Sequence, residues 1–160
     1  MAESIAQDLK VIVFRLKDEE YGVPVQQVGS IERMQHITRV PNTPEFVKGV
    51  INLRGVVTPI LDLRKRFGIE NVDYTESTRI IIVYVDDIEV GLIVDAANDV
   101  IDIPTDAIEP APEVVGTIDD DYIHGVAKLD KRLLVLLDLK NTLSHGEVKE
   151  IKTMEGSREQ

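Results

Sequence analysis

The side chains that could do chemistry are few and scattered along this chain of 160 residues. His36, His124 and His145 stand apart, and none has a second metal-binding residue at the spacing that metal sites use. There is no cysteine, which excludes disulfides and thiolate metal sites. The glycine-rich phosphate loops and the GxSxG and HExxH motifs of hydrolases are also missing. The sequence therefore predicts no metal, no cofactor and no catalytic site.

Two aspartates are the best remaining candidates for acid and base chemistry. Asp62 and Asp138 are each the middle residue of a Leu-Asp-Leu sequence that a basic residue follows, so they occupy equivalent places in two similar segments. Residues made equivalent by a repeat are expected to share a structural task, and Asp is a preferred helix cap. We interpret both as caps. The alternative, a small hydrolase, requires the two carboxylates to face one cleft within about 10 Å of each other.

Composition narrows the class of protein further. The chain is 43% hydrophobic and 29% charged, which is ordinary for a globular protein, and its length is that of one domain. A net charge of −11 repels phosphate backbones, so nucleic acid is not an expected partner. The longest apolar runs are far shorter than a membrane span, and the first residues do not form a secretion signal. We therefore expect a cytoplasmic protein without direct membrane insertion.

The sequence repeats itself. Residues 10–25 align without a gap on residues 79–94, and residues 49–67 align on residues 125–143. The second pair shares Gly-Val, a Leu, and then Leu-Asp-Leu with a basic residue. An insertion around 116–122, which contains an acidic run expected to be a solvated loop, separates the two alignments. A single domain over 1–160 is thus predicted to contain two related subdomains, approximately 10–76 and 79–143, with tails at 1–8 and 146–160.

Each half is expected to form mainly strands, because its apolar runs are rich in β-branched residues and are separated by short turn-forming pairs. Pro-bearing stretches between the hairpins are expected to be loops, and short helical segments follow each second hairpin. About five short strands per half cannot hide their edges as an open sheet, so the fold class is all-β with two small barrels packed together. The expected strands are Val11–Leu16, Tyr21–Val28, Gly49–Leu53, Val56–Leu61, Ile80–Val85, Ile88–Val94, Gly125–Leu129 and Arg132–Leu137.

Residues 40–68, VPNTPEFVKGVINLRGVVTPILDLRKRFG, closely resemble the CheW family of chemotaxis adaptors. The Asn-Leu-Arg-Gly motif at 52–55 and the Pro-Ile-Leu-Asp-Leu-Arg motif at 59–64 occur in one uninterrupted order, and the likeness extends over roughly residues 8–145. The resemblance implies two SH3-like five-stranded β-barrels. It also implies a scaffold, not an enzyme, that binds the cytoplasmic tip of chemoreceptors and the regulatory domain of the CheA histidine kinase. Such a protein is recruited to membrane-associated receptor arrays and controls kinase autophosphorylation.

Site residues follow from the same resemblance. Arg54 lies at an expected hairpin tip that does not require Arg, which suits pairing with a partner's carboxylate. Gly55 could equally serve the turn alone through a positive φ, and Phe46 is more simply explained as a buried residue. Ser30 stands where many relatives have an acidic residue, with Glu32 two places further on. The implied receptor-binding residues are Val28, Ile31, Gly49, Arg54 and Gly55, and the implied kinase-binding residues are Glu45, Phe46, Glu113 and Val114.

Two related proteins are alternatives within this fold. A CheV-like protein would carry a receiver domain after the adaptor domain, and the chain ends at Gln160. A kinase regulatory domain would share the fold, but the well-matched Asn-Leu-Arg-Gly motif favours a stand-alone adaptor. The sequence therefore predicts a non-enzymatic adaptor first.

Overall fold

The computed structural model describes residues 8–43, 47–66, 73–85, 87–110 and 123–139. Strands dominate these residues, with one short α-helix, α2 (Leu63–Arg66), and two 3-10 turns, η1 (Val25–Gln27) and η2 (Thr105–Ala107). The strands are β1 (Asp8–Leu16), β2 (Glu19–Pro24), β3 (Val28–Arg33), β4 (Val47–Leu53), β5 (Val56–Asp62), β6 (Arg79–Val85), β7 (Ile88–Val94), β8 (Ala96–Pro104), β9 (Ile108–Glu109), β10 (Ile123–Leu129) and β11 (Arg132–Leu137).

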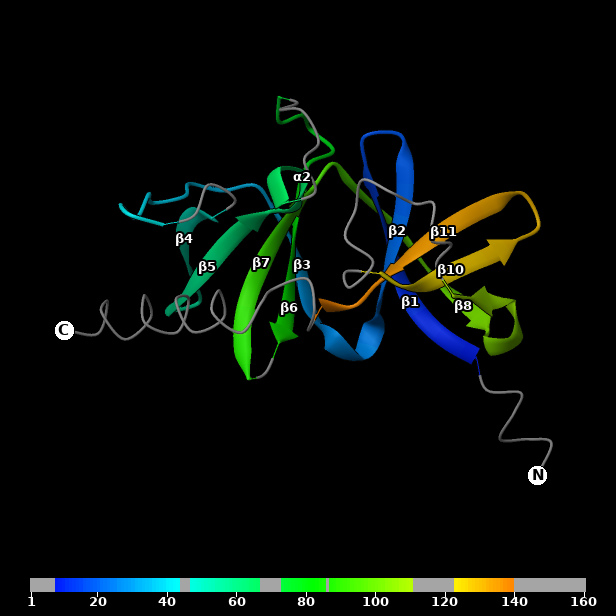
Figure 1. Ribbon diagram of the computed structural model, residues 1–160. Helices are drawn as coiled ribbons and strands as arrows, with labels where there is room; N and C mark the ends of the chain where they lie inside the picture. Colours follow the sequence, from blue (N-terminus) through cyan, green and yellow to red (C-terminus); the bar gives the residue numbers. More distant parts are fainter. Residues whose placement is uncertain (1–7, 44–46, 67–72, 86, 111–122, 140–160) are drawn as a thin grey trace.

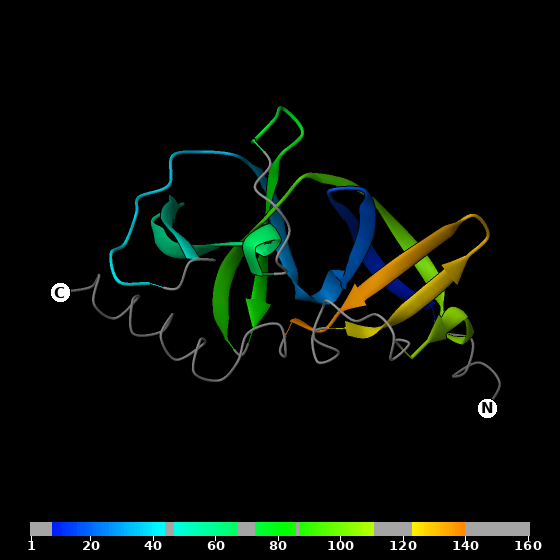
Figure 2. The same ribbon diagram turned by 45° about the horizontal axis from the view of Figure 1, so that its top comes forward.

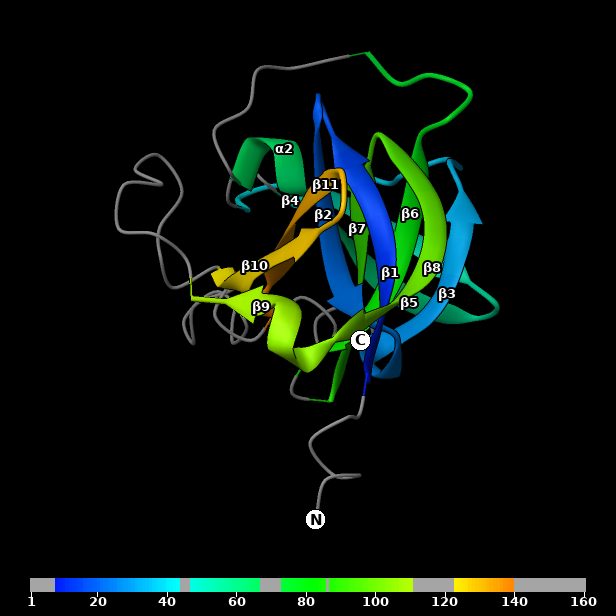
Figure 3. The ribbon, with the colours of Figure 1, turned by 90° about the vertical axis from the view of Figure 1, so that its right-hand side faces the viewer.

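The strands form two sheets that lie next to each other (Figure 1). We call the six-stranded sheet, of order β8-β1-β2-β11-β10-β9, barrel A, and the five-stranded sheet, of order β3-β6-β7-β5-β4, barrel B. Figure 3 looks along the line that joins them, with barrel A in front. The all-β fold with two SH3-like subdomains, expected from the sequence, is confirmed.

Each barrel takes strands from both halves of the repeat. Barrel A combines β1 and β2 with strands of the second half, and barrel B combines β6 and β7 with strands of the first half. The chain crosses from one barrel to the other between β2 and β3 and again between β7 and β8 (Figure 2). The expected halves 10–76 and 79–143 therefore do not coincide with the two sheets. The sequence repeat marks pairs of equivalent strands, and the strands exchange partners.

The eight strands expected from the sequence are present with small differences at their ends. The largest difference concerns Tyr21–Val28, which was expected to be one strand. The structure ends β2 at Pro24, forms η1, and starts β3 at Val28 in the other sheet. Pro24 has no amide hydrogen to continue a ladder, and the 3-10 turn that follows it redirects the chain.

Burial on both faces explains the unbroken apolar runs of β1 and β6. Val11 and Val13 pack inside barrel A, while Ile12 and Phe14 on the opposite face of β1 join a central cluster. Strand β6 repeats this pattern, with Ile80 and Ile82 inside barrel B and Ile81 and Val83 in the central cluster. Because the central cluster contains residues of both sheets, the two barrels share one continuous apolar interface.

Barrel B is closed between its two outer strands, β3 and β4. The segment after β3 returns to β4, where the Thr38 amide donates to the Val50 carbonyl at 2.9 Å and the Val50 amide donates back at 2.8 Å. Gly49 lies at this contact with a φ of 148°, and a Cβ atom there would stand 2.1 Å from the Thr38 carbonyl oxygen. Closure thus needs a residue without a side chain at this position.

No helix within the described residues has the length and apolar character needed to cross a membrane.

Candidate functional site

The turn between β4 and β5 presents Arg54 at its tip. Arg54 has a φ of 54° and Gly55 a φ of 87°, the pair of positive angles of a tight two-residue hairpin turn. The Gly55 amide donates a 2.8 Å hydrogen bond to the Asn52 side-chain oxygen, which fixes the turn from within. The positive φ expected at Gly55 is confirmed, and it gives this glycine a structural reason.

The Arg54 guanidinium is paired on one side and open on the other. Its Nη2 lies 3.2 Å from Glu32 Oε2, so the pair links the β4–β5 turn to β3 across the edge of barrel B. The Arg54 side chain remains 72% exposed, whereas that of Glu32 is 19% exposed. The shielded carboxylate holds an exposed cation in place. The remaining guanidinium donors stay accessible to a partner's carboxylate.

Glu32 was not assigned a role from the sequence, where it was noted only as displaced from the usual acidic position. In the structure Glu32, two residues further along β3 than Ser30, is the residue that reaches Arg54. Successive side chains of a strand point to opposite faces, so Ser30 and Glu32 share one face and a displacement by two keeps the carboxylate on it. This period of two was the signal that could have identified the pair.

Tyr84 and Glu89 extend the surface beside Arg54 and were also missed. The Thr58 hydroxyl donates a 3.0 Å hydrogen bond to Glu89 Oε1. A hydrogen bond with Glu89, and then the negative charge of that carboxylate, raise the pKa of Tyr84, while the positive charge of Arg54 opposes the shift. Tyr84 is 46% exposed. An aromatic ring with a polar tip therefore stands close to the exposed cation, a combination common at protein interfaces.

The other implied receptor-binding residues are placed differently. Ile31 is an exposed apolar residue of β3, 43% accessible, and its side chain points to the face opposite Glu32. Val28 is partly buried against the central cluster. Gly49 is buried at the barrel closure. The structure thus brings Arg54 and Gly55 together at one tip, places Ile31 on another face of β3, and gives Gly49 a packing role.

The four residues implied in kinase binding, Glu45, Phe46, Glu113 and Val114, lie outside the described residues. Their assignment stays a prediction.

Asp62, the candidate acid or base, is occupied by other bonds. Its carboxylate accepts the Arg64 amide at 3.0 Å, which makes it the cap of α2 as expected. It also accepts the Arg64 side chain at 3.1 and 3.2 Å, and both residues are buried. Burial opposes the charged form of Arg64, but the bond to Asp62 and the charges of Asp62 and Asp95 outweigh it and raise the pKa of the guanidinium. The Asp62 carboxylate is therefore engaged by bonds within the fold.

Metal chemistry gains no support from the part of the chain that the structure describes. No group of three or more His, Cys, Asp or Glu side chains there could hold a metal ion.

Comparison with known proteins confirms the resemblance found in the sequence. The CheW-like domain family matches residues 10–147. The chemotaxis protein CheW of Bacillus subtilis (strain 168) is 48% identical over 143 residues, covering 89% of this chain and 92% of that protein. The CheW of Klebsiella aerogenes is 39% identical over 146 residues, covering 91% and 87%. A crystal structure of the scaffolding protein TtCheW from Thermoanaerobacter tengcongensis matches with a TM-score of 0.81 at 40% identity, covering 88% and 91%. With its two barrels that exchange strands between the halves of the repeat and its Asn-Leu-Arg-Gly turn, the chain belongs to the CheW family of chemotaxis scaffold proteins.

Proposed function

We propose that this protein is a non-enzymatic adaptor that couples chemoreceptors to the CheA histidine kinase and controls its autophosphorylation. It would act in the cytoplasm, recruited to receptor arrays at the membrane. The observation that carries the proposal is the exposed Arg54 at a rigid turn, backed by the shielded carboxylate of Glu32. A preorganised cation loses little conformational freedom when it binds a partner's carboxylate, so it favours specific docking.

Two surfaces are assigned to partners in this proposal. The receptor tip contacts Arg54, Ile31 and Val28, with Gly49 and Gly55 shaping the backbone that supports them. The kinase regulatory domain contacts Glu45 and Phe46 in the first half and Glu113 and Val114 in the second. Coupling requires that these contacts differ between the active and inactive arrangements of the kinase, because equal affinity for both would shift no equilibrium.

A charge reversal tests the proposal. Replacing Arg54 with Glu removes the donor and places like charges beside Glu32, so binding to a receptor cytoplasmic fragment or to the kinase regulatory domain should weaken by about 1 to 3 kcal/mol. Isothermal titration calorimetry of the purified chain against each partner measures the change. Thermal unfolding followed by circular dichroism should show a folded variant, because Arg54 is exposed.

Lys131→Glu is the matched control. Lys131 is exposed in the β10–β11 turn of barrel A, so this variant makes the same charge change at the equivalent hairpin of the other barrel. Binding should be unchanged by it. Equal affinities of the wild-type chain and the Arg54→Glu variant for both partners would remove Arg54 from the site, and binding of the wild type to neither partner would refute the adaptor proposal itself.

A further inference from the structure

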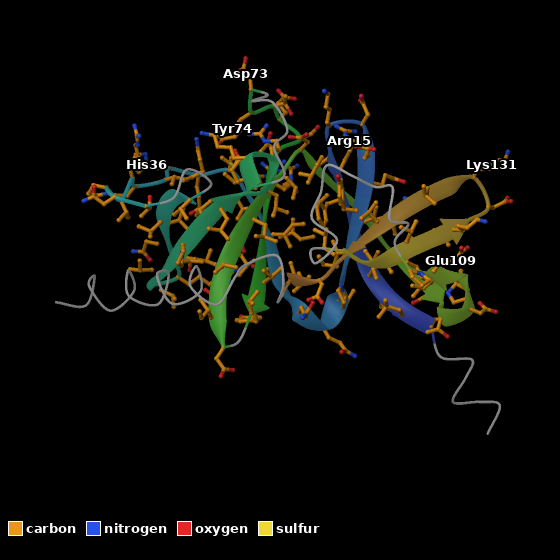
Figure 4. The ribbon with its side chains drawn as sticks, in the orientation of Figure 1. Arg15, His36, Asp73, Tyr74, Glu109 and Lys131 are labelled. Carbon is orange, nitrogen blue, oxygen red and sulfur yellow. The ribbon has the colours of Figure 1, made fainter. Side chains whose placement is uncertain are left out.

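A large hollow opens on barrel B beside α2. It has a volume of about 1020 Å³ and lies between the segment that follows β3, the start of β4, α2 and Tyr74. Figure 4 shows Tyr74 next to α2. Apolar side chains, among them Met34, Ile37 and Val47, form part of its wall. The volume is at the upper limit of small-molecule pockets, and a wall of mixed polarity suits a segment of polypeptide.

The charges at this hollow are the reverse of those of the whole chain. Arg39, Lys48 and Lys65 line it from three different elements, and no Asp or Glu is found among its described lining residues. The chain as a whole carries a net charge of −11. Three cations gathered on an acidic protein create a local positive potential that attracts anionic groups.

These cations are not consumed by ion pairs with the described residues. The salt bridges of the described chain involve other basic side chains, namely Lys10, Arg54, Arg64, Lys128 and Arg132. Arg64 is close by, but Asp62 and Asp95 hold its guanidinium at 3.1 and 3.2 Å. Among the described residues no carboxylate pairs with Arg39, Lys48 or Lys65, whereas Arg64 is held by two.

Tyr74 organises the rim of the hollow. The centroid of its ring lies 5.8 Å from Lys48 Nζ and 5.2 Å from the Arg64 guanidinium carbon. Burial and the charge of Asp62 raise the pKa of Tyr74, so the ring stays neutral near pH 7. Contact with an aromatic face restrains the flexible Lys48 side chain, which lowers the entropy lost when an anion binds to it.

We propose that this hollow is a docking site for an acidic segment of a protein partner, with carboxylates on Arg39, Lys48 and Lys65 and apolar side chains against Met34, Ile37 and Val47. The proposal does not rest on the coupling function. Lys48 is at the start of β4 and Arg54 follows its end, so roughly 20 Å separates the two sites at about 3.3 Å per strand residue. The hollow and the Arg54 turn can therefore be tested separately.

Fluorescence anisotropy with the full chain provides the test. The probe is a short labelled peptide that alternates Glu with Leu, and the comparison peptide replaces each Glu with Gln. We expect the Glu peptide to bind, the Gln peptide to bind at least about tenfold more weakly, and the affinity for the Glu peptide to fall as salt is added. The double variant Lys48→Glu with Lys65→Glu should lower the affinity for the Glu peptide by at least about tenfold.

The controls separate this site from a general charge effect and from the Arg54 site. Lys131→Glu, in the hairpin tip of barrel A (Figure 4), should leave peptide binding unchanged, and Arg54→Glu should lower it less than the double variant at Lys48 and Lys65 does. A second pair, Lys48→Gln with Lys65→Gln, should also lose affinity, which shows that lost attraction and not a new repulsion is responsible. Equal binding of the Glu and Gln peptides, no binding of either, or equal binding by the double variant and the wild type would overturn the proposal. The proposal would also be overturned if inorganic phosphate, added at the same total charge as the Glu peptide, displaced that peptide, since this would indicate a site for any anion.

Discussion

At the scale of single residues, Gly49 and Gly55 show two different reasons for a glycine. Gly55 has a φ of 87° in the β4–β5 turn and open space within 4 Å of where a Cβ would stand. Gly49 combines a φ of 148° with a Cβ position only 2.1 Å from the Thr38 carbonyl oxygen. Thr38 in turn pairs with Val50 to close barrel B. The first glycine serves the backbone alone, whereas the second also makes room for the segment that follows β3.

Replacing each glycine with Ala should separate the two effects. We expect Gly55→Ala to cost about 1 kcal/mol, because only an unfavourable φ is imposed. Gly49→Ala should cost more than about 3 kcal/mol, since the added methyl group must also push Thr38 away from Val50. Urea denaturation of both variants measures the two costs. Similar costs for the two variants would contradict the role of the Thr38 contact. A loss of partner binding by Gly49→Ala would then indicate that Gly49 contacts the partner directly.

The residues of the Arg54 site were predictable to different degrees. The sequence indicated an exposed Arg54 and a positive φ at Gly55, because a two-residue turn between apolar runs carries that information locally. Glu32, Tyr84 and Glu89 are distant in sequence, and only the pairing of β3, β6, β7 and β5 brings them to the turn. Such pairing leaves no local pattern in a single sequence.

At the scale of elements, a buried ionic cluster joins the two barrels at α2. Arg64 of α2 contacts Asp62 at 3.1 Å and Asp95 at 3.2 Å, and Asp95 stands between β7 of barrel B and β8 of barrel A. The other Asp95 carboxylate oxygen accepts the Lys17 amide, in the β1–β2 turn, at 2.6 Å. The Asp95 amide donates to the Arg15 carbonyl at 2.9 Å. The cluster therefore ties the turn of one barrel to the helix of the other.

Removing only the cation of this cluster should lower the free energy of unfolding more than removing the cation together with one carboxylate charge. Arg64→Met leaves the buried Asp62 and the half-buried Asp95 without their cation, and we expect a loss of about 3 to 5 kcal/mol in the free energy of unfolding. Adding Asp62→Asn to that variant removes one uncompensated charge and should restore part of the loss. Urea denaturation of the single and double variants measures both. Because Asn caps a helix as well as Asp does, a double variant less stable than Arg64→Met alone would show that groups other than Arg64 stabilise the Asp62 charge.

The elements themselves were largely visible in the sequence, because hairpins combine β-branched runs with short polar turns. The strands missed, β3, β8 and β9, are outer strands whose side chains are partly exposed, so their apolar pattern is weak. The break at Pro24 was missed because the apolar residues continue through Val25 and Val28 while the chain changes sheet.

At the scale of the whole molecule, the exchange of strands makes the two halves depend on each other. Barrel A needs β10 and β11 from the second half beside β2, where Gly22 pairs with Leu136 in parallel. Barrel B needs β7 beside β5, where Ile60 pairs with Gly91. The equivalence of the two pairings reflects the repeat, but the repeat alone does not say whether equivalent strands pair within a half or between halves. Both arrangements would bury the same apolar faces, so composition and periodicity could not distinguish them.

Dividing the chain between β5 and β6 tests this interdependence. Fragments 1–76 and 77–160 each contain an initial hairpin whose partner strands lie in the other fragment. We expect each fragment alone to lack a cooperative unfolding transition by circular dichroism, and an equimolar mixture to regain strand content as a one-to-one complex by analytical ultracentrifugation. A fragment that folds as a monomer would contradict the exchange, because its strands would then have to pair within one half. A fragment that instead dimerises with itself would agree with it, since the repeat lets a second copy supply the equivalent strands.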